Sequence, residues 1–400
     1  MTKEKTIKYC DNIIEWGFYS LLIFVTFSIS LVDIAAACVI SAWIIKKCID
    51  RDLKIVKSLP VIVLSVYVAW VFLSCFNSLY WKESLHGIFK VLKVSLLFIV
   101  TASELNKKKV VKRSLYVIVV SVIITGFNGL YQYMNGVDLI RHRTLTPLDH
   151  LRRISSSFVH PNSFGIYLFV VCIIIAAFVF SKNIKLKNRM LLIPPFLLSL
   201  WCLFLTGSRG AWFSLIISGF TFSLVRSKKW LIIFLCTIVL IFAVIPASVQ
   251  SRITDVFDLS SGTSWERIML WKGAVKMIEV HPVLGFGINT YSKNFPAYKP
   301  EGYVDLRYSH NCYLQMASEI GIPGTLFFLL FLISVFVFIY KRIRRMDEGY
   351  NKDMLTGLFC ALIGFSFGAA TDTHLYSVVL AVFFYILLGF SFSLARHETK

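Results

Sequence analysis

Charged residues are scarce in this 400-residue sequence: they make up 16% of the chain, whereas hydrophobic residues make up 57%. Carboxylates are scarcer than bases, with 22 Asp and Glu against 42 Lys and Arg. A chain of this length cannot hide so many apolar groups in a water-soluble core, which excludes an ordinary soluble protein. The composition therefore predicts an integral membrane protein.

The motifs of the commonest cofactor sites are also missing. The sequence has no CxxC pair, no HExxH, no Walker loop and no GxGxxG fingerprint. Its nine cysteines are odd in number and fall mostly inside apolar runs, so we do not expect a disulfide framework. We therefore expect neither a metal nor another cofactor.

Apolar runs long enough to cross a bilayer recur along the chain. A transmembrane helix needs about 17 to 25 apolar residues, and windows of that size give about 12 candidate spans. The second is short, so the first two also fit a hairpin around Asp33. The predicted fold is an all-α polytopic membrane protein with spans near residues 14–31, 34–45, 60–77, 87–102, 115–132, 164–181, 190–205, 210–225, 230–247, 322–340, 354–370 and 376–394.

The basic residues are unevenly distributed between the connections. Most of the 42 Lys and Arg lie in alternate connections, which include 1–12, 103–114 and 341–353. This is the positive-inside bias of membrane proteins, so the net charge of +20 does not call for a nucleic-acid partner. Both termini are predicted to be cytoplasmic, and the N-terminal apolar run is predicted to be an uncleaved anchor.

Two of the outward connections are long. Residues 1–247 are predicted to hold nine spans with a periplasmic loop at 133–163, and residues 322–400 the last three spans. Residues 248–321 between them form a large periplasmic loop with two helix signals. Thr263 and Glu266 have capping-box spacing ahead of one helix, which ends near Pro282. The second begins at Ser309 as N-cap and stops at Gly321, and we expect both to be amphipathic helices at the membrane surface.

Two arginines follow helix-start signals on the outward side. Ser208 can cap the next helix, which leaves Arg209 at the positive helix end, and Arg267 falls in the first turn after Thr263. Guanidinium groups pair bidentately with phosphate oxygens, so Arg209 and Arg267 together suggest a diphosphate clamp. The alternatives are a snorkelling Arg209 and a solvated Arg267.

His310 is the candidate base. It is predicted to lie in the first turn of its helix, where the helix dipole disfavours the charged ring, and a neutral imidazole can accept a proton. An interfacial histidine bonded to a carbonyl is the alternative. Asn311, Gln315 and Glu319 follow at four-residue spacing as a polar stripe, which solvent or a substrate could contact.

Four further residues are candidates for substrate binding. Arg152, Arg153 and His160 lead into the sixth predicted span from the first long loop. Asp372 is the only carboxylate between the last two predicted spans. A turn role explains Asp372 as well as substrate contact does.

Three segments together resemble a known family. "TGSRGAW", "WERIMLWKGAVKMIEVHPVLGFG" and "SHNCYLQMASEIGIPG" are similar, in this order, to the O-antigen ligase and polymerase family of bacterial inner-membrane glycosyltransferases. The resemblance is strongest over residues 150–330. It implies a GT-C-like fold and metal-independent transfer of a glycan from undecaprenyl diphosphate, in ligases to the lipid A core of lipopolysaccharide.

The resemblance also implies roles for individual residues. By match of motif, the two essential arginines of the family fall on Arg209 and Arg267, its essential histidine on His310 and a functional aspartate on Asp372. The expected partners are an undecaprenyl-diphosphate-linked glycan donor, a lipid A-core acceptor and membrane lipids. The expected place is the inner membrane, with the active site periplasmic.

Three functions remain open at this point. An O-antigen ligase is favoured by the motifs, and an O-antigen polymerase that joins repeat units is the alternative within the same chemistry. A flippase or transporter would need ionisable groups near the membrane midplane. The predicted spans contain only Glu15, Lys90 and Lys93, all near span ends.

Overall fold

The computed structural model describes residues 3–51, 57–105, 108–148, 151–244, 262–301, 303 and 308–397. Within them the chain is almost entirely helical, with one small antiparallel sheet. The elements are α1 (Lys3–Phe24), α2 (Ile29–Asp50), α3 (Leu59–Ser74), η2 (Cys75–Asn77), α4 (Trp81–Glu104), α5 (Lys108–Asn135), β1 (Thr146–Leu148), β2 (Leu151–Arg153), α6 (Pro161–Val179), α7 (Leu186–Leu205), α8 (Arg209–Arg226), α9 (Lys228–Val244), α11 (Gly262–Val280), α12 (Tyr291–Asn294), η3 (Phe295–Ala297), α13 (Cys312–Ile343), α14 (Tyr350–Gly368), η4 (His374–Tyr376) and α15 (Val378–His397).

Several of these helices can cross a membrane. Eight candidate spans in the described residues are long and apolar enough, namely α2, α3 with η2, α4, α5, α6, α7, α13 and α15. This supports the prediction of an all-α, multi-pass membrane protein, while the count of twelve stays a prediction. The alternative prediction of a hairpin around Asp33 is wrong, because Asp33 lies inside α2. Ser28 caps α2 by accepting from Leu31 N, so the chain turns before residue 29 and α2 runs for 22 residues.

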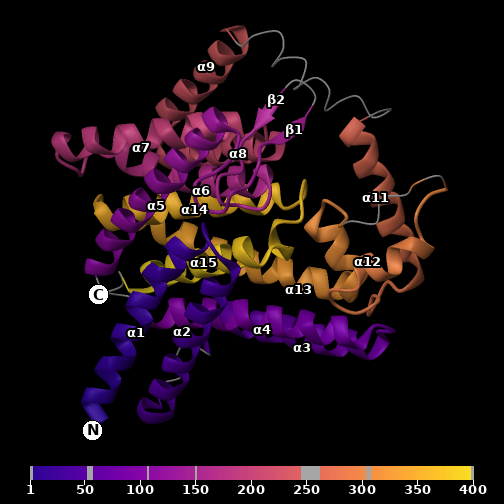
Figure 1. Cartoon of the computed structure of the whole chain (residues 1–400). Helices are drawn as coiled ribbons and strands as arrows, with labels where there is room; N and C mark the ends of the chain where they lie inside the picture. Colours follow the sequence, from indigo (N-terminus) through magenta and orange to yellow (C-terminus); the bar gives the residue numbers. More distant parts are fainter. Residues whose placement is uncertain are drawn as a thin grey trace.

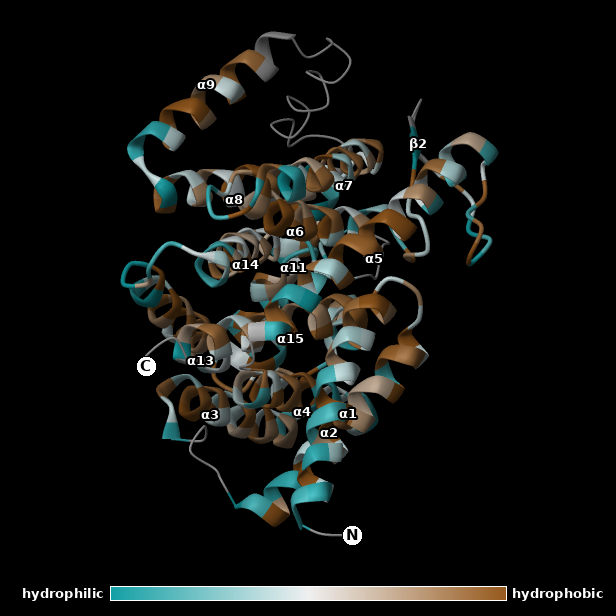
Figure 2. Ribbon diagram, turned by 90° about the vertical axis from the view of Figure 1, so that its left-hand side faces the viewer, coloured by the Kyte–Doolittle hydropathy of each residue, from teal (hydrophilic) through white to brown (hydrophobic). Residues whose placement is uncertain are grey.

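Two helices form the centre of the bundle. The membrane-length windows of α6 and α15 are each 89% buried. α15 packs against α4, and α6 packs against α14, which also contacts α8 (Figure 1). Gly364 permits the close contact between α14 and α8, because a Cβ at that position would lie 1.9 Å from Ser218 Oγ. Hydrophobic residues run along the bundle helices, whereas hydrophilic residues gather near the N-terminus (Figure 2).

Polar contacts join the connecting segments at each of two ends of the bundle. At one end Lys46 bridges Asp11 and Glu104, each at 2.6 Å, so the N-terminal segment meets the α2 and α4 ends. At the other end Asn77 donates to the carbonyl of Gly285 at 2.6 Å. The charge pattern had assigned these two groups of connections to opposite sides of the membrane. The side that each group faces stays a prediction.

The predicted loop helices exist with different starts. α11 begins at Gly262, so Thr263 lies inside the helix and is not its N-cap. α13 is capped by Asn311 and not by Ser309, because Asn311 Oδ1 accepts from the backbone of Tyr313 and Leu314. The stop predicted at Gly321 is present as a break within α13, because the φ of Gly321 is 73° and its backbone is not helical. Residues 245–247 of the ninth predicted span and 248–261 of the predicted loop lie outside the described residues.

Candidate active site

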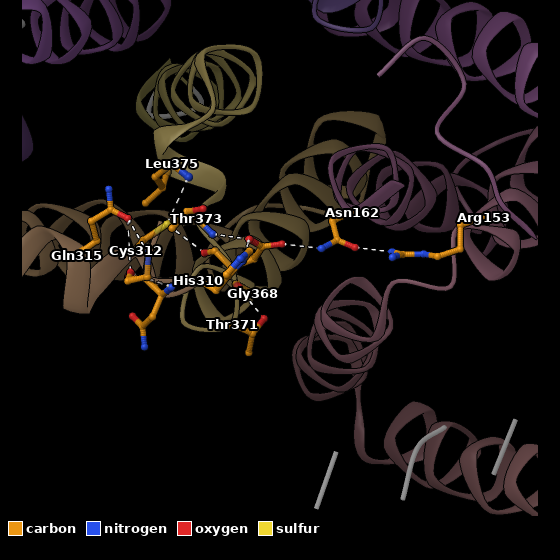
Figure 3. A network of polar contacts seen from close by, with 12 residues as sticks. Arg153, Asn162, His310, Cys312, Gln315, Gly368, Thr371, Thr373 and Leu375 are labelled. Carbon is orange, nitrogen blue, oxygen red and sulfur yellow. Dashed lines mark hydrogen bonds and ion pairs between the residues drawn. The ribbon is translucent and has the colours of Figure 1, made fainter. Parts of the chain in front are cut away.

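A chain of hydrogen bonds joins four side chains from three separate parts of the sequence (Figure 3). Arg153 Nη2 donates to Asn162 Oδ1 at 2.6 Å, and Asn162 Nδ2 donates to Asp372 Oδ2 at 2.9 Å. Asp372 Oδ1 lies 3.0 Å from Nδ1 of His310. We call Arg153, Asn162, Asp372 and His310 the polar relay. The relay connects β2, the first turn of α6, the α14–η4 connection and the residue that precedes the α13 cap.

The relay has a fixed direction. A guanidinium only donates, so Asn162 must turn its oxygen towards Arg153 and its amide nitrogen towards Asp372. An ionised Asp372 only accepts, and its Oδ1 also takes the backbone N–H of Thr373 at 2.8 Å. The Nδ1 of His310 therefore carries the hydrogen, which leaves Nε2 of the neutral ring as an acceptor. The arrangement holds His310 in the tautomer that a general base requires.

The surroundings keep Asp372 ionised. Burial alone raises the pKa of its carboxyl, but the hydrogen bond from His310, the charges that His374 and His310 carry when they are protonated at low pH, and the charge of Arg267 hold that pKa far below its usual range. Burial also lowers the pKa of His374, despite the opposing effect of Asp372. With its pKa lowered in this way, Asp372 accepts the hydrogen bond of His310, whose side chain is 34% exposed.

His310 is placed by local backbone geometry. It lies before α13 and not in the first turn as predicted, and its φ of 51° is in the left-handed region. The helix dipole was expected to disfavour the charged ring. Because His310 lies outside the helix, we assign the orientation of the ring to its hydrogen bond with Asp372. Two contacts tie the neighbouring Cys312 to the α14–η4 connection, since its N–H donates to Ala369 O at 2.8 Å and its Sγ lies 3.2 Å from Asp372 O.

The two predicted clamp arginines approach this site from different helices. Arg209 is the first residue of α8, and Ser208 caps that helix as predicted by accepting from Ala211 N at 3.4 Å. The next residue, Gly210, faces Thr371, whose Oγ1 lies 3.0 Å from the position of a Cβ on the glycine. This contact places the start of α8 beside the connection that carries Asp372.

Arg267 lies in the second turn of α11 and not in the first, because the helix begins at Gly262. Its charge still reaches the site, where it lowers the pKa values of Asp372 and His374. Whether Arg209 and Arg267 bind one diphosphate stays a prediction.

A cavity of about 770 Å³ opens beside the relay. Its wall is formed by the α1–α2 turn, the loop before α6, the start of α6 and the segment from Asp372 to Leu380. Arg153, Asn162, His310 and Asp372 of the polar relay all line it. The cavity is large enough to admit part of a sugar chain, whereas Arg209 and Arg267 are not among its lining residues.

The remaining candidates occupy different places. His160 lines the cavity at the N-cap position of α6, whereas Arg152 is exposed on β2 outside the relay. Asn311 uses its side-chain oxygen to cap α13, and its role in substrate binding stays a prediction. The solvated alternative for the polar stripe is wrong for Gln315 and Glu319, which are fully buried.

Sequence reasoning missed Asn162. Asn162 lies in the segment "HPNSFG". Its role could not be recognised there, because it depends on a hydrogen bond to Asp372, 210 positions later in the chain. No group of three or more His, Cys, Asp or Glu that could hold a metal ion exists among the residues with described coordinates. The chemistry that the site itself offers is a partly buried carboxylate, an oriented imidazole and nearby guanidinium groups.

Comparison with known proteins gives one family match. Residues 194–329 match the family model described as O-Antigen ligase, which confirms the resemblance seen in the three sequence segments. The matched range contains Arg209, Arg267 and His310. A search of curated proteins finds no match.

Among solved structures, a chain from "Structural coordination of polymerization and crosslinking by a peptidoglycan synthase complex" is similar, with 12% identity and a TM-score of 0.48. The similarity covers 85% of this chain and 98% of that chain.

Proposed function

We propose that this protein, with its O-antigen ligase match over residues 194–329, is a membrane glycosyltransferase that moves a glycan from a polyprenyl diphosphate to an acceptor hydroxyl. The observation that carries the proposal is the pair of His310 and Asp372 in the wall of the cavity, 3.0 Å apart. A partly buried carboxylate that fixes the tautomer of a partly exposed imidazole is the arrangement of a general base.

The reaction follows from the orientation of His310. The acceptor hydroxyl gives its proton to Nε2 as its oxygen attacks the anomeric carbon of the donor. The bond between that carbon and the diphosphate oxygen breaks, and the polyprenyl diphosphate leaves with the bonding electrons. Asp372 stabilises the imidazolium that forms, because its own carboxyl stays ionised.

The leaving group needs a compensating positive charge. Arg209 and Arg267 are proposed to supply it, since guanidinium groups pair bidentately with phosphate oxygens. Their support is the position of Arg209 at the capped start of α8 and the influence of Arg267 on Asp372. In this mechanism arginine does the work that a divalent cation does in many phosphate-handling enzymes.

The acceptor is proposed to be the lipid A core of lipopolysaccharide, which makes the protein an O-antigen ligase with undecaprenyl diphosphate as the donor carrier. An O-antigen polymerase uses the same chemistry on a different acceptor and remains the second candidate. The proposed site is the periplasmic face of the inner membrane, with both termini in the cytoplasm. This agrees with the grouping of the connections at two ends of the bundle.

A deletion strain separates the two candidates. Loss of a ligase leaves long glycan chains on undecaprenyl diphosphate and none on the lipid A core. Loss of a polymerase leaves single repeat units attached to the core. A gel of whole-cell lipopolysaccharide, probed beside the lipid-linked fraction, measures both, and a deletion strain with a normal ladder contradicts the proposed function.

A further inference from the structure

A turn that carries two further arginines forms part of the cavity wall. Arg141 and Arg143 line the same cavity as His310 and Asp372, although they come from the connection between α5 and β1. Neither arginine belongs to the polar relay. We call residues 136–145 the arginine turn.

The backbone of the arginine turn is held by Asp138. Its buried carboxylate accepts the N–H groups of Ile140 at 2.9 Å, Arg141 at 2.8 Å and Arg143 at 2.6 Å. Gln132 Nε2 on α5 also donates to the carbonyl of Arg143 at 3.0 Å. The carboxylate of Asp138 is thus turned to the backbone, and the two guanidinium groups project from a fixed support.

The charges of these two arginines are not neutralised within the described part of the chain. Neither forms an ion pair there, and Arg141 donates only to a neutral group, the carbonyl of Phe27 at 2.8 Å. The Nε of Arg143 is buried and has no hydrogen-bond partner among the residues that the structure describes. A buried donor that no protein group satisfies is uncommon in folded proteins and indicates a position where a ligand or an ordered water can bind.

The rest of the cavity wall favours an anion. Among the described lining residues Asp372 is the only carboxylate, and both of its oxygens are occupied by the relay and by Thr373. A guanidinium with a free Nε edge matches the paired oxygens of a phosphate or carboxylate. An oxyanion is therefore the ligand that this part of the cavity wall fits best.

We propose that the arginine turn, through Arg143 with support from Arg141, binds an oxyanion of the acceptor glycan. This inference rests on the proposed function, which assigns the donor diphosphate to Arg209 and Arg267, outside the cavity lining. The proton that His310 removes must come from the molecule beside it in the cavity, which is the acceptor. Arg143 would then fix the acceptor so that its hydroxyl meets His310.

Binding of the acceptor tests this proposal separately from catalysis. Purified protein in lipid nanodiscs is titrated with rough-type lipopolysaccharide, with the same material after phosphatase treatment, and with undecaprenyl diphosphate. Arg143→Gln removes the charge and Arg143→Lys keeps the charge without the planar fork. Lys272→Gln is the matched control, because Lys272 is an exposed base on α11 outside the cavity lining.

Arg143→Gln should weaken binding of rough lipopolysaccharide about tenfold or more, the loss expected for a hydrogen bond to a charged group. The affinity of Arg143→Lys for rough lipopolysaccharide should lie between the affinities of Arg143→Gln and the parent. Neither change should alter the binding of undecaprenyl diphosphate. If phosphatase treatment removes the difference, the oxyanion is a phosphate; if the difference persists, it is a carboxylate of the core sugars.

Equal affinity of the parent and Arg143→Gln for rough lipopolysaccharide would overturn the proposal, and so would a loss confined to undecaprenyl diphosphate. Because binding does not require transfer, a failure here leaves the transfer measurements on His310 unaffected. Those measurements test the proposed function itself.

Discussion

Replacing Asp372 with asparagine tests the direction of the polar relay. Asp372 accepts from His310 and Thr373 at Oδ1 and from Asn162 at Oδ2. An amide cannot accept at both ends. If its oxygen faces His310, its NH₂ group meets the NH₂ group of Asn162, which Arg153 prevents from turning over. If its NH₂ group faces His310 instead, Nδ1 must lose its hydrogen and Nε2 can no longer act as the base.

The size of the effect follows from these two placements. Loss of a hydrogen bond to a charged group costs about 1.5–3 kcal/mol, or roughly 10- to 150-fold in rate. Loss of the base altogether costs about 10²- to 10⁴-fold. We expect the transfer rate of Asp372→Asn to be at least tenfold below that of the parent, and to stay above that of His310→Ala.

The reversed pair should recover activity. In Asn162→Asp/Asp372→Asn the carboxylate faces Arg153 and the new amide can donate to it, while the amide oxygen again accepts from His310 Nδ1. Neutral hydrogen bonds contribute about 0.5–1.5 kcal/mol, so the double variant should exceed Asp372→Asn by up to about tenfold. The single change Asn162→Asp places two carboxylates side by side and should be impaired.

Initial rates of glycan transfer by purified variants in nanodiscs measure this cycle, after equal insertion and thermal stability have been confirmed. A double variant no better than Asp372→Asn, or an Asp372→Asn protein with the parental rate, refutes the reasoning about relay direction.

Three further predictions concern the clamp, the cation and the topology. Arg209→Lys and Arg267→Lys should each be nearly as damaging to transfer as the alanine changes, because lysine lacks the planar fork, whereas Lys272→Ala should be near neutral; normal rates for both lysine variants would reduce the arginines to point charges. Transfer in vitro should persist in EDTA, and a loss restored by magnesium or manganese would contradict the arginine clamp. Reporter fusions after residues 110, 185 and 345 should be cytoplasmic and those after 145 and 290 periplasmic, and a cytoplasmic signal at 290 would place the site on the wrong side.

Much of the fold was predictable because it depends on composition. A helix in a bilayer satisfies its own backbone hydrogen bonds, so long apolar runs such as α6 and α15 can be recognised one at a time. The cap of α8 at Ser208 was also local and was predicted correctly. Ser309 and Asn311 are both residues that can cap a helix, and both lie just before α13. The sequence pattern predicted Ser309, whereas the cap is Asn311.

The site was predictable only in part. The sequence indicated His310, Arg153 and Asp372 as separate candidates. Their connection through hydrogen bonds depends on the helix packing that brings α6, α13 and α14 together. Asn162 carries no signal of its own, since an asparagine after a proline at a helix start is an ordinary residue. The sequence could not show that Arg143 Nε lies in the cavity wall without a partner among the described residues, because that depends on the folded structure.

Transfer by the His310 variant tests the central claim most directly. Purified parent, His310→Ala and the control Lys272→Ala are compared in nanodiscs with an undecaprenyl-diphosphate-linked glycan and rough lipopolysaccharide. Removal of the base should slow transfer about 10²- to 10⁴-fold while the control keeps the parental rate. A His310→Ala protein that is inserted normally and decorates the acceptor at close to the parental rate would contradict the account, and His310 would then be only an interfacial residue.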